Sequence, residues 1–313
     1  MRILLVGCSG LVGRGLLPLL LEQGHHCTLV SRAPRPLPGL EHPSLQRFQA
    51  DPSQGASWRQ PQLLEALTAA EAVVNLAGEP IAEQRWTPQH LQLLRDSRIL
   101  TTRHLVDALA ALPAGQRPQL LINGSAIGYY GTSSTAVFTE DSPAGADVLA
   151  ALCVAWEAEA RRAEGLCRLV ILRTGIVLAA DGGALGKMLP VFRLGFGGPI
   201  GDGRQWMSWI SRRDICALIA AALNDASYAG VYNATAPQPS TMAAFAAALG
   251  RCLGRPSLLP VPAPILSLLL GDGAKVVLEG QQVLPQRLQQ QGFAFRDAEL
   301  SAALAAATSS APR

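Results

Sequence analysis

The chain has 313 residues, 49% of them hydrophobic and 16% charged, a balance that excludes a disordered chain and allows a large buried core. The formal net charge is only +3, and no basic run alternates with aromatic residues, so we expect no nucleic-acid partner. No apolar stretch reaches the roughly 20 residues of a membrane-spanning helix, and the six cysteines form no CxxC pair. We therefore expect a cytoplasmic protein with no membrane partner and no metal site.

The first predicted strand, Ile3–Val6, leads directly into a glycine-rich loop. The glycines of this loop are Gly7, Gly10 and Gly13, and the apolar, helix-like stretch Leu16–Leu21 follows them. The first glycine permits a tight turn, the second lets the backbone approach a pyrophosphate, and the third lets the helix pack close to the sheet. The N–H groups and dipole of the helix N-terminus favour phosphate at this place. The pattern predicts a dinucleotide site, with a purely structural strand-to-helix turn as the alternative.

The second predicted strand, Cys27–Val30, ends at Ser31 and Arg32. In NAD sites this position carries an acidic residue that accepts hydrogen bonds from the ribose hydroxyls. A carboxylate would repel a 2′-phosphate, whereas Ser and Arg would bind it. A charge-assisted hydrogen bond contributes about 1.5–3 kcal/mol, or about tenfold to a hundredfold in affinity. We therefore expect NADP(H) as the cofactor. An exposed arginine beside a turn is the alternative, with Arg35 as a competing phosphate ligand.

Further strands alternate with helices along the chain. Strands are predicted over Ala72–Asn75, Leu120–Asn123, Leu169–Arg173 and Gly230–Ala234, and long helices over Thr87–Leu112 and Val148–Glu164. Such alternation predicts βαβ units, hence an α/β fold with a doubly wound parallel sheet. The sequence Asn75-Leu76-Ala77-Gly78 follows one of these strands, and its small residues would let the backbone pass beside the adenosine and diphosphate. By itself this segment could equally be an ordinary strand end.

Two local features bear on this plan. Pro18 is expected to kink the first helix or to shift its start, because it cannot donate a hydrogen bond to Arg14. The stretch Asp181–Gly203 carries eight glycines, too many for a helix, and is predicted to be a substrate-facing segment that leaves the sheet after its sixth strand.

These features suggest a division of the chain. Residues 1–178 are expected to form the nucleotide-binding domain, with its sheet completed by about residues 207–235. Residues 179–206 and 236–313 are expected to form a smaller substrate-side and C-terminal region, rich in alanine and leucine after Pro237.

Several longer strings resemble one known family. They are NLAGEPIAEQRW (Asn75–Trp86), DSR (Asp96–Arg98), GSAIGYYG (Gly124–Gly131), LRTGIVL (Leu172–Leu178), the glycine-rich segment Gly182–Gln205, and LEGQQVLPQRL (Leu278–Leu288). The chain resembles the extended short-chain dehydrogenase/reductase superfamily over almost its whole length. The match is closer still to an atypical branch labelled epimerase family protein, NAD-dependent epimerase/dehydratase-like.

The resemblance implies a Rossmann domain, NADP(H) binding and a small C-terminal domain. It suggests cofactor contacts at Ser31, Arg32, Leu76, Ala77, Arg98 and Val177. Together with Gly7, Gly10, Leu11, Val12, Gly13 and Gly78, these residues make up the predicted cofactor site. One departure is Ser211 in the string WISRRD, where relatives tend to have His.

The Tyr-x-x-x-Lys pair that typical superfamily members use is absent. The two lysines have Gly183 and Gly271 four residues before them. In typical members an acidic residue often follows the lysine by four positions, and Glu157 could be that residue. Counting back from it places Cys153 at the position of the lysine and Leu149 at the position of the tyrosine. This departure affects mechanism, because the usual lysine helps the tyrosine act as a base.

Only four tyrosines occur, and two of them follow the predicted strand that carries Ser125. Tyr129 and Tyr130 would lie at the carboxyl edge of the sheet, where substrates bind in open α/β folds. A tyrosine has a reference pKa near 10 and would be protonated at neutral pH, so it can donate a proton to a carbonyl oxygen during reduction. We predict Tyr129 or Tyr130 as the acid and Ser125 as the orienting group. The alternative is that both tyrosines only line the pocket or pack.

Other side chains could face an anionic substrate. Lys187, Arg193 and Arg204 lie in or beside the glycine-rich segment, although solvated surface charges are the simpler interpretation. Trp86, Trp206 and Trp209 could wall an apolar pocket or simply pack.

Two functions remain open at this point. The first is an NADP(H)-dependent oxidoreductase or epimerase-like enzyme acting on a small carbonyl or nucleotide-sugar substrate. The second is a non-catalytic NADP(H)-binding sensor or regulatory protein, which the missing Tyr-x-x-x-Lys pair favours. Neither the substrate nor the oligomeric state follows from the sequence.

Overall fold

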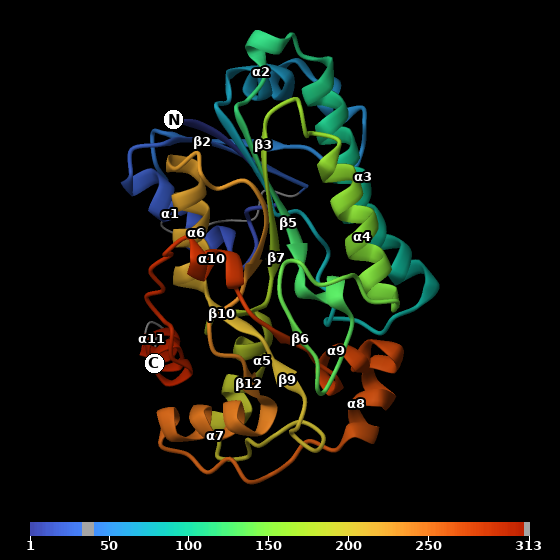
Figure 1. Ribbon diagram of the computed structural model, residues 1–313, viewed down its shortest axis with the longest axis vertical. Helices are drawn as coiled ribbons and strands as arrows, with labels where there is room; N and C mark the ends of the chain where they lie inside the picture. The colour runs from blue at the N-terminus through green and yellow to red at the C-terminus, as the bar shows by residue number, and fades with distance from the viewer. Residues whose placement is uncertain (33–40, 310–313) are drawn as a thin grey trace.

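The central layer of the protein is a parallel β-sheet (Figure 1), seen in a computed structural model that describes residues 1–32 and 41–309. Its strands are β1 (Arg2–Val6), β2 (His26–Ser31), β3 (Leu45–Gln49), β4 (Ala72–Asn75), β5 (Leu120–Ala126), β7 (Arg168–Thr174) and β11 (Gly230–Ala234). They are ordered β3-β2-β1-β4-β5-β7-β11, and every neighbouring pair is parallel. The predicted fold class is therefore confirmed. Strand β3 was not predicted, because LQRFQ is an edge strand of mostly polar residues.

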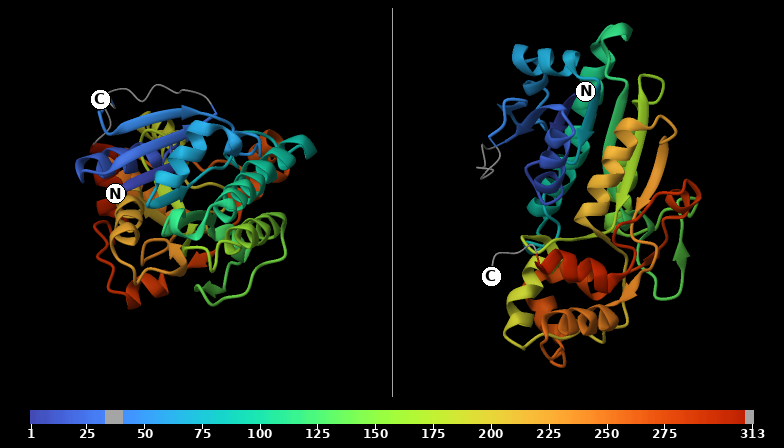
Figure 2. Two further views of the ribbon diagram at one scale, coloured as in Figure 1. Left: turned by 90° about the horizontal axis from the view of Figure 1, so that it is seen from above. Right: turned by 90° about the vertical axis from the view of Figure 1, so that its left-hand side faces the viewer.

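Helices cover both faces of this sheet (Figures 1 and 2). Helices α1 (Gly13–Glu22) and α6 (Arg212–Asn224) pack on one face, and α2 (Pro61–Ala69) and α3 (Pro88–Ala111) on the other, with α4 (Val148–Arg161) beside α3. Strand β1 shows why both faces need cover. Ile3 and Leu5 pack under α1 and α6, while Leu4 and Val6 pack under α2 and α3.

Two local expectations can be compared with the helices. Helix α1 begins at Gly13 and contains Pro18, so the proline does not set its start. The expectation that residues 181–203 contain no helix was wrong, because α5 spans Gly183–Arg193. Leu185 and Leu189 lie four residues apart and are buried on one face of α5, and this burial stabilises the helix despite its glycines.

A smaller region lies at the carboxyl edge of the sheet, in the lower half of Figure 1. Its helices are α5, α7 (Met242–Leu253), α8 (Ala263–Leu270), α9 (Lys275–Leu278) and α11 (Leu300–Ser309), whereas α10 (Gln286–Gln290) packs on β11 of the sheet. Its short strands are β6 (Val137–Phe138), β8 (Ile176–Leu178), β9 (Trp206–Met207), β10 (Trp209–Ser211), β12 (Ser240–Thr241) and β13 (Gln282–Val283). A separate apolar core joins α5, α7 and α11. Within the ranges described above, no helix is long and apolar enough to span a bilayer.

The register of the sheet brings several loops together. Val6 at the end of β1 is paired with Val30 of β2 and with Asn75 of β4. Asn75 in turn is paired with Asn123 of β5. The loops that follow β1, β2, β4 and β5 therefore meet at one edge of the sheet, which is where open α/β folds place their ligands.

Candidate functional site

Two of the loop glycines are required by the packing of the chain itself. Gly7 has a φ of +73°, and a Cβ there would lie 2.4 Å from the Cα of Ala77 in the loop after β4. A Cβ on Gly13 would lie 1.8 Å from the carbonyl oxygen of Cys8. The turn and the close approach of α1 to the sheet thus explain these two glycines without any ligand.

Gly10 is different, because no neighbouring group requires a glycine there. The nearest atom to a Cβ at this position would be the carbonyl oxygen of Gly7, at 3.8 Å. The open space lies beside the first turn of α1, where N–H groups and the helix dipole favour an anion. Because Gly10 has no side chain to fill this space, a diphosphate could approach the backbone there.

The rest of the loop is covered by the segment before α5. A Cβ on Gly182 or Gly183 would lie 3.0 Å and 2.8 Å, respectively, from methyl carbons of Leu11. Val12 precedes α1, and its carbonyl oxygen accepts hydrogen bonds from the first turn of that helix. Val177 in β8 lies next to Gly183, since its carbonyl oxygen would be 3.5 Å from a Cβ there. The predicted contacts Leu11, Val12 and Val177 therefore lie around one loop.

The end of β2 presents a cation to solvent. The Arg32 side chain is 54% exposed and its Nη2 lies 3.0 Å from Oε2 of Glu79, which follows the β4 loop. Ser31 lies beside it, and its carbonyl oxygen accepts a hydrogen bond from the N–H of Ala50. Sequence reasoning missed Glu79, although it lies within the quoted string NLAGEPIAEQRW. The competing candidate Arg35 lies outside the described residues.

The loop after β4 packs against a second cation, Arg98 of α3. A Cβ on Gly78 would lie 2.9 Å from the Arg98 guanidinium carbon. This guanidinium donates hydrogen bonds to the carbonyl oxygens of Glu79 and Leu94, and no ion pair to it is found within the described ranges. Desolvation by burial lowers the pKa of Arg98, while the neighbouring Cys153 and Glu79 act in the opposite direction. Leu76 and Ala77 complete this loop, and Asn75 fixes it by accepting from the Ala77 N–H.

The predicted catalytic residues Ser125 and Tyr130 belong to a buried hydrogen-bond network. The Ser125 hydroxyl donates to Oε1 of Glu157 at 2.7 Å. Arg173 donates through Nε and Nη2 to both oxygens of Glu157, at 2.8 and 2.9 Å. Its Nη1 donates to the Tyr130 hydroxyl, which itself donates to Oδ1 of Asn233 at 2.6 Å. Burial raises the pKa of Tyr130 to about 12, so this phenol stays protonated at neutral pH.

Tyr129 has different surroundings. It is half-buried, and the guanidinium carbon of Arg173 lies 3.4 Å from the centre of its ring. Across the described residues, its hydroxyl makes no hydrogen bond to another side chain. The two tyrosines therefore differ, because the Tyr130 hydroxyl is engaged by both Asn233 and Arg173.

Helix α4 carries Leu149 and Cys153, the residues at the positions where the usual tyrosine and lysine were expected. Leu149 and Cys153 both face the turn after β5, 3.4 Å and 3.9 Å from a Cβ placed on Gly128. Burial raises the pKa of the Cys153 thiol to about 12, so it carries no charge there. Neither residue can supply the cation that a lysine would.

The remaining candidate contacts are spread out. Lys187 donates to the carbonyl oxygen of Ala82, whereas Arg193 and Arg204 are exposed. Trp206 donates to the carbonyl oxygen of Ser134, and Trp209 is fully buried in the core of the smaller region.

Two further residues that the sequence analysis singled out have structural contacts. Trp86 is half-buried and packs against Gly273 of the C-terminal segment. Ser211, where relatives tend to have His, begins α6 by accepting a hydrogen bond from the Asp214 N–H.

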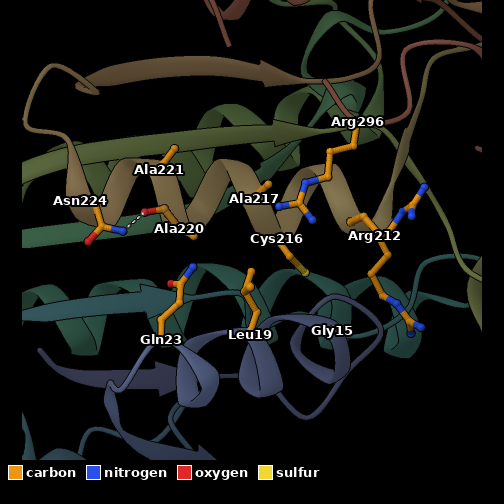
Figure 3. Close-up of a pocket in the computed structure, with 11 residues that line it drawn as sticks. Gly15, Leu19, Gln23, Arg212, Cys216, Ala217, Ala220, Ala221, Asn224 and Arg296 are labelled. Atoms are coloured by element: carbon orange, nitrogen blue, oxygen red, sulfur yellow. Dashed lines mark hydrogen bonds between the residues drawn. The ribbon is translucent and has the colours of Figure 1, made fainter. Parts of the chain in front are cut away.

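A cavity of about 460 Å³ lies between α1 and α6 (Figure 3). It starts at Gly15, where a Cβ would lie 3.0 Å from Cγ of Arg212, and it extends toward Gln23 and Asn224. Arg212 at this end is paired with Asp181. The cavity thus follows the body of α1 away from the glycine loop, and it is not the place where a diphosphate meets the helix N-terminus.

The residues around the loop fit a dinucleotide with a phosphorylated ribose. Gly10 leaves open space beside a helix N-terminus, and Arg98 forms no ion pair with the residues that the structure describes. Arg32 stands where an NAD site would carry an acid. No group of side chains in the described part of the chain could hold a metal ion. The sheet order and this loop together define a Rossmann-type α/β protein.

Comparison with known proteins gives the family. The model of the NAD dependent epimerase/dehydratase family matches residues 3–234, and a domain of unknown function, DUF1731, matches residues 261–307. The chain belongs to the NAD dependent epimerase/dehydratase family.

Similar proteins occur in plants and animals. The chain is 41% identical over 300 residues to the chloroplastic epimerase family protein SDR39U1 homolog of Arabidopsis thaliana, covering 95% of this chain and 83% of the relative. It is 36% identical to the human epimerase family protein SDR39U1, whose crystal structure contains NADPH; the TM-score is 0.86, with 99% of this chain and 100% of that chain covered. UDP-glucuronic acid 4-epimerase of Bacillus cereus shares the fold, with 18% identity, a TM-score of 0.77, and 97% and 96% coverage.

Proposed function

We propose that the protein binds NADP(H) at the glycine loop and acts as an oxidoreductase or epimerase-like enzyme on a small carbonyl or nucleotide-sugar substrate. The observation that carries the cofactor proposal is Arg32, whose exposed guanidinium stands at the end of β2. The presence of NADPH in the similar human protein supports the same choice.

Electrostatics explains why this position selects the phosphorylated cofactor. A 2′-phosphate beside Arg32 would accept charge-assisted hydrogen bonds from its guanidinium. In the structure this guanidinium donates to one carboxylate, that of Glu79. NAD(H) carries only a hydroxyl there and gains much less. The nearby Arg98, which lacks an acidic partner, would favour the other negative charges of the cofactor or an anionic substrate.

Replacing Arg32 tests the cofactor proposal. We expect Arg32→Asp to weaken NADPH binding by about tenfold to a hundredfold, with NADH affinity changed much less, since one charge-assisted contact is replaced by repulsion. The measurement is titration calorimetry with both cofactors. Arg59→Asp, at an exposed arginine in the short 3-10 helix Ser57–Arg59, is the matched control. Equal NADPH and NADH losses, or no loss, would overturn the proposal.

Tyr129 is the proposed proton donor. When bound, NADPH would supply a hydride to the substrate carbonyl carbon. Tyr129 would donate its phenolic proton to the carbonyl oxygen and recover a proton from water. The Arg173 guanidinium against its ring would stabilise the negative charge that this transfer leaves on the phenol. Ser125 and Tyr130 would act as positioning residues, because both hydroxyls donate to Glu157 or Asn233.

Removing the Tyr129 hydroxyl tests this role. We expect Tyr129→Phe to lower kcat for NADPH-dependent carbonyl reduction by about a hundredfold or more, the usual contribution of general acid catalysis. NADPH affinity and melting temperature should stay near those of the wild type. The assay is a carbonyl and nucleotide-sugar library followed by NADPH consumption. Undiminished turnover in the variant would exclude Tyr129 as the acid.

A non-catalytic NADP(H)-binding protein is the second candidate. It is favoured by Leu149 and Cys153, which leave α4 without an acid–base pair beside the turn after β5. Tight NADPH binding with no turnover across the same library would support this function over the first.

A further inference from the structure

The end of the smaller region that lies farthest from the sheet is built from two neighbouring loops (Figure 1). One follows α5 and the other follows α7. The Leu259 N–H donates to the carbonyl oxygen of Gly197, and the Val261 N–H donates to that of Pro199. We call residues 191–198 and 251–259 the basic end.

Large apolar side chains of the basic end face solvent. Leu194 is 71% exposed, Phe196 is 62% exposed and Leu258 is 81% exposed. They are close in space, because Gly195 lies against Pro256 and Gly197 is bonded to Leu259. Isolated exposed apolar residues need no explanation, but these three lie on adjoining loop tips.

The charged residues within the basic end itself are all of one sign. The segments 182–201 and 242–271, which contain α5, α7, α8 and the two loops, have no Asp or Glu. Their basic residues are Lys187, Arg193, Arg251 and Arg255. The three arginines are exposed, and none forms an ion pair with any described residue. The chain as a whole is nearly balanced, with 26 basic and 23 acidic residues, so this is a local segregation of charge.

We propose that the basic end docks on an anionic lipid surface. Exposed leucine and phenylalanine tips with arginines beside them match the boundary between acyl chains and anionic headgroups. A two-fold contact between copies of this chain would bring the same arginines together, and no acid of these segments could compensate them. Lipid headgroups supply negative charge at any position, so they need no matching pattern.

Docking of this kind differs from spanning a membrane. The sequence expectation of no membrane partner rested on the absence of a long apolar segment. A peripheral contact needs only a few apolar tips and cations. This inference is independent of the proposed catalytic function.

Vesicle sedimentation of the full-length protein tests the proposal. We expect the protein to sediment with vesicles of phosphatidylcholine containing about 30 mol% phosphatidylglycerol at about 0.1 M salt, and not with phosphatidylcholine alone. Arg251→Glu/Arg255→Glu should lower the bound fraction by about tenfold or more, because two attractions become repulsions. Phe196→Ser/Leu258→Ser should lower it similarly by removing the apolar contact.

Matched controls separate this surface from general effects. Arg59→Glu/Arg95→Glu changes two exposed arginines elsewhere, and Leu64→Ser/Val148→Ser changes two exposed apolar residues elsewhere. Both controls should bind like the wild type, and all variants should keep their melting temperature. Failure of the wild type to sediment, equal binding to neutral vesicles, or equal loss in the controls would overturn the proposal. So would a dimer in ultracentrifugation that Phe196→Ser/Leu258→Ser dissociates, since a second copy would then cover this face.

Discussion

Two regions lie at the same edge of the sheet: the cofactor side, formed by the loops after β2 and β4, and the catalytic side, formed by the turn after β5. They differ in how their charged side chains are exposed and paired. On the cofactor side, Arg32 is exposed and Arg98 has no acidic partner within the described residues. On the catalytic side, Arg173 and Glu157 are both 3% exposed and neutralise each other through two hydrogen bonds. The first region holds an exposed pair, Arg32 with Glu79, and one cation, Arg98, that forms no ion pair with a described residue, whereas in the second region both charges are buried and paired.

This difference indicates where function resides. A buried, fully paired network fixes the backbone after β5 and the orientation of Tyr129 above Arg173. On the cofactor side, the Arg32 guanidinium is exposed although it pairs with Glu79, and the space beside Gly10 is open. The network therefore fixes the turn after β5, and the loops after β1, β2 and β4 form the proposed cofactor site.

The largest effect on stability is expected from breaking the buried pair. Glu157→Ala would leave Arg173 buried and uncompensated, which costs about 3–5 kcal/mol of unfolding free energy. Glu164→Ala is the matched control, because its pair with Arg161 is exposed and should cost less than about 1 kcal/mol. Urea denaturation measures both. Equal losses would show that the two regions do not differ as described.

A smaller effect is expected from Tyr130→Phe. Removing the hydroxyl leaves Asn233 Oδ1 and Arg173 Nη1 each one partner short, which costs about 1–3 kcal/mol. The cost should shrink at alkaline pH. Burial raises the pKa of Tyr130 to about 12, from an unfolded value near 10, so its contribution is present below pH 10 and is lost as the pH rises toward 12. Parallel pH profiles of stability for wild type and variant would contradict this account.

Short sequence patterns predicted the glycine loop and most strands of the central sheet, because these elements depend on neighbouring residues. The glycine loop and the strands that became β1, β2, β4, β5, β7 and β11 follow from apolar runs and their flanking residues. The spacing of Leu185, Leu189 and Phe192 could have revealed α5, had the apolar positions been given more weight than the glycines.

The ion pairs and hydrogen bonds between distant parts of the chain could not be predicted in this way. Arg32 and Glu79 lie 47 residues apart, and Tyr130 and Asn233 lie 103 apart. Only the folded sheet brings such residues together. The string LRTGIVL did contain Arg173, but nothing in its local sequence shows that it pairs with Glu157 instead of facing a ligand.

The most direct test of the central claim is the NADPH affinity of Gly10→Ala. A methyl group there meets only an atom at 3.8 Å, so the melting temperature should be unchanged, while loss of the diphosphate approach should weaken NADPH binding by about tenfold or more. Gly115→Ala, another glycine with open space around it, should change neither quantity. Wild-type NADPH affinity in Gly10→Ala would contradict the claim that this loop is a dinucleotide site.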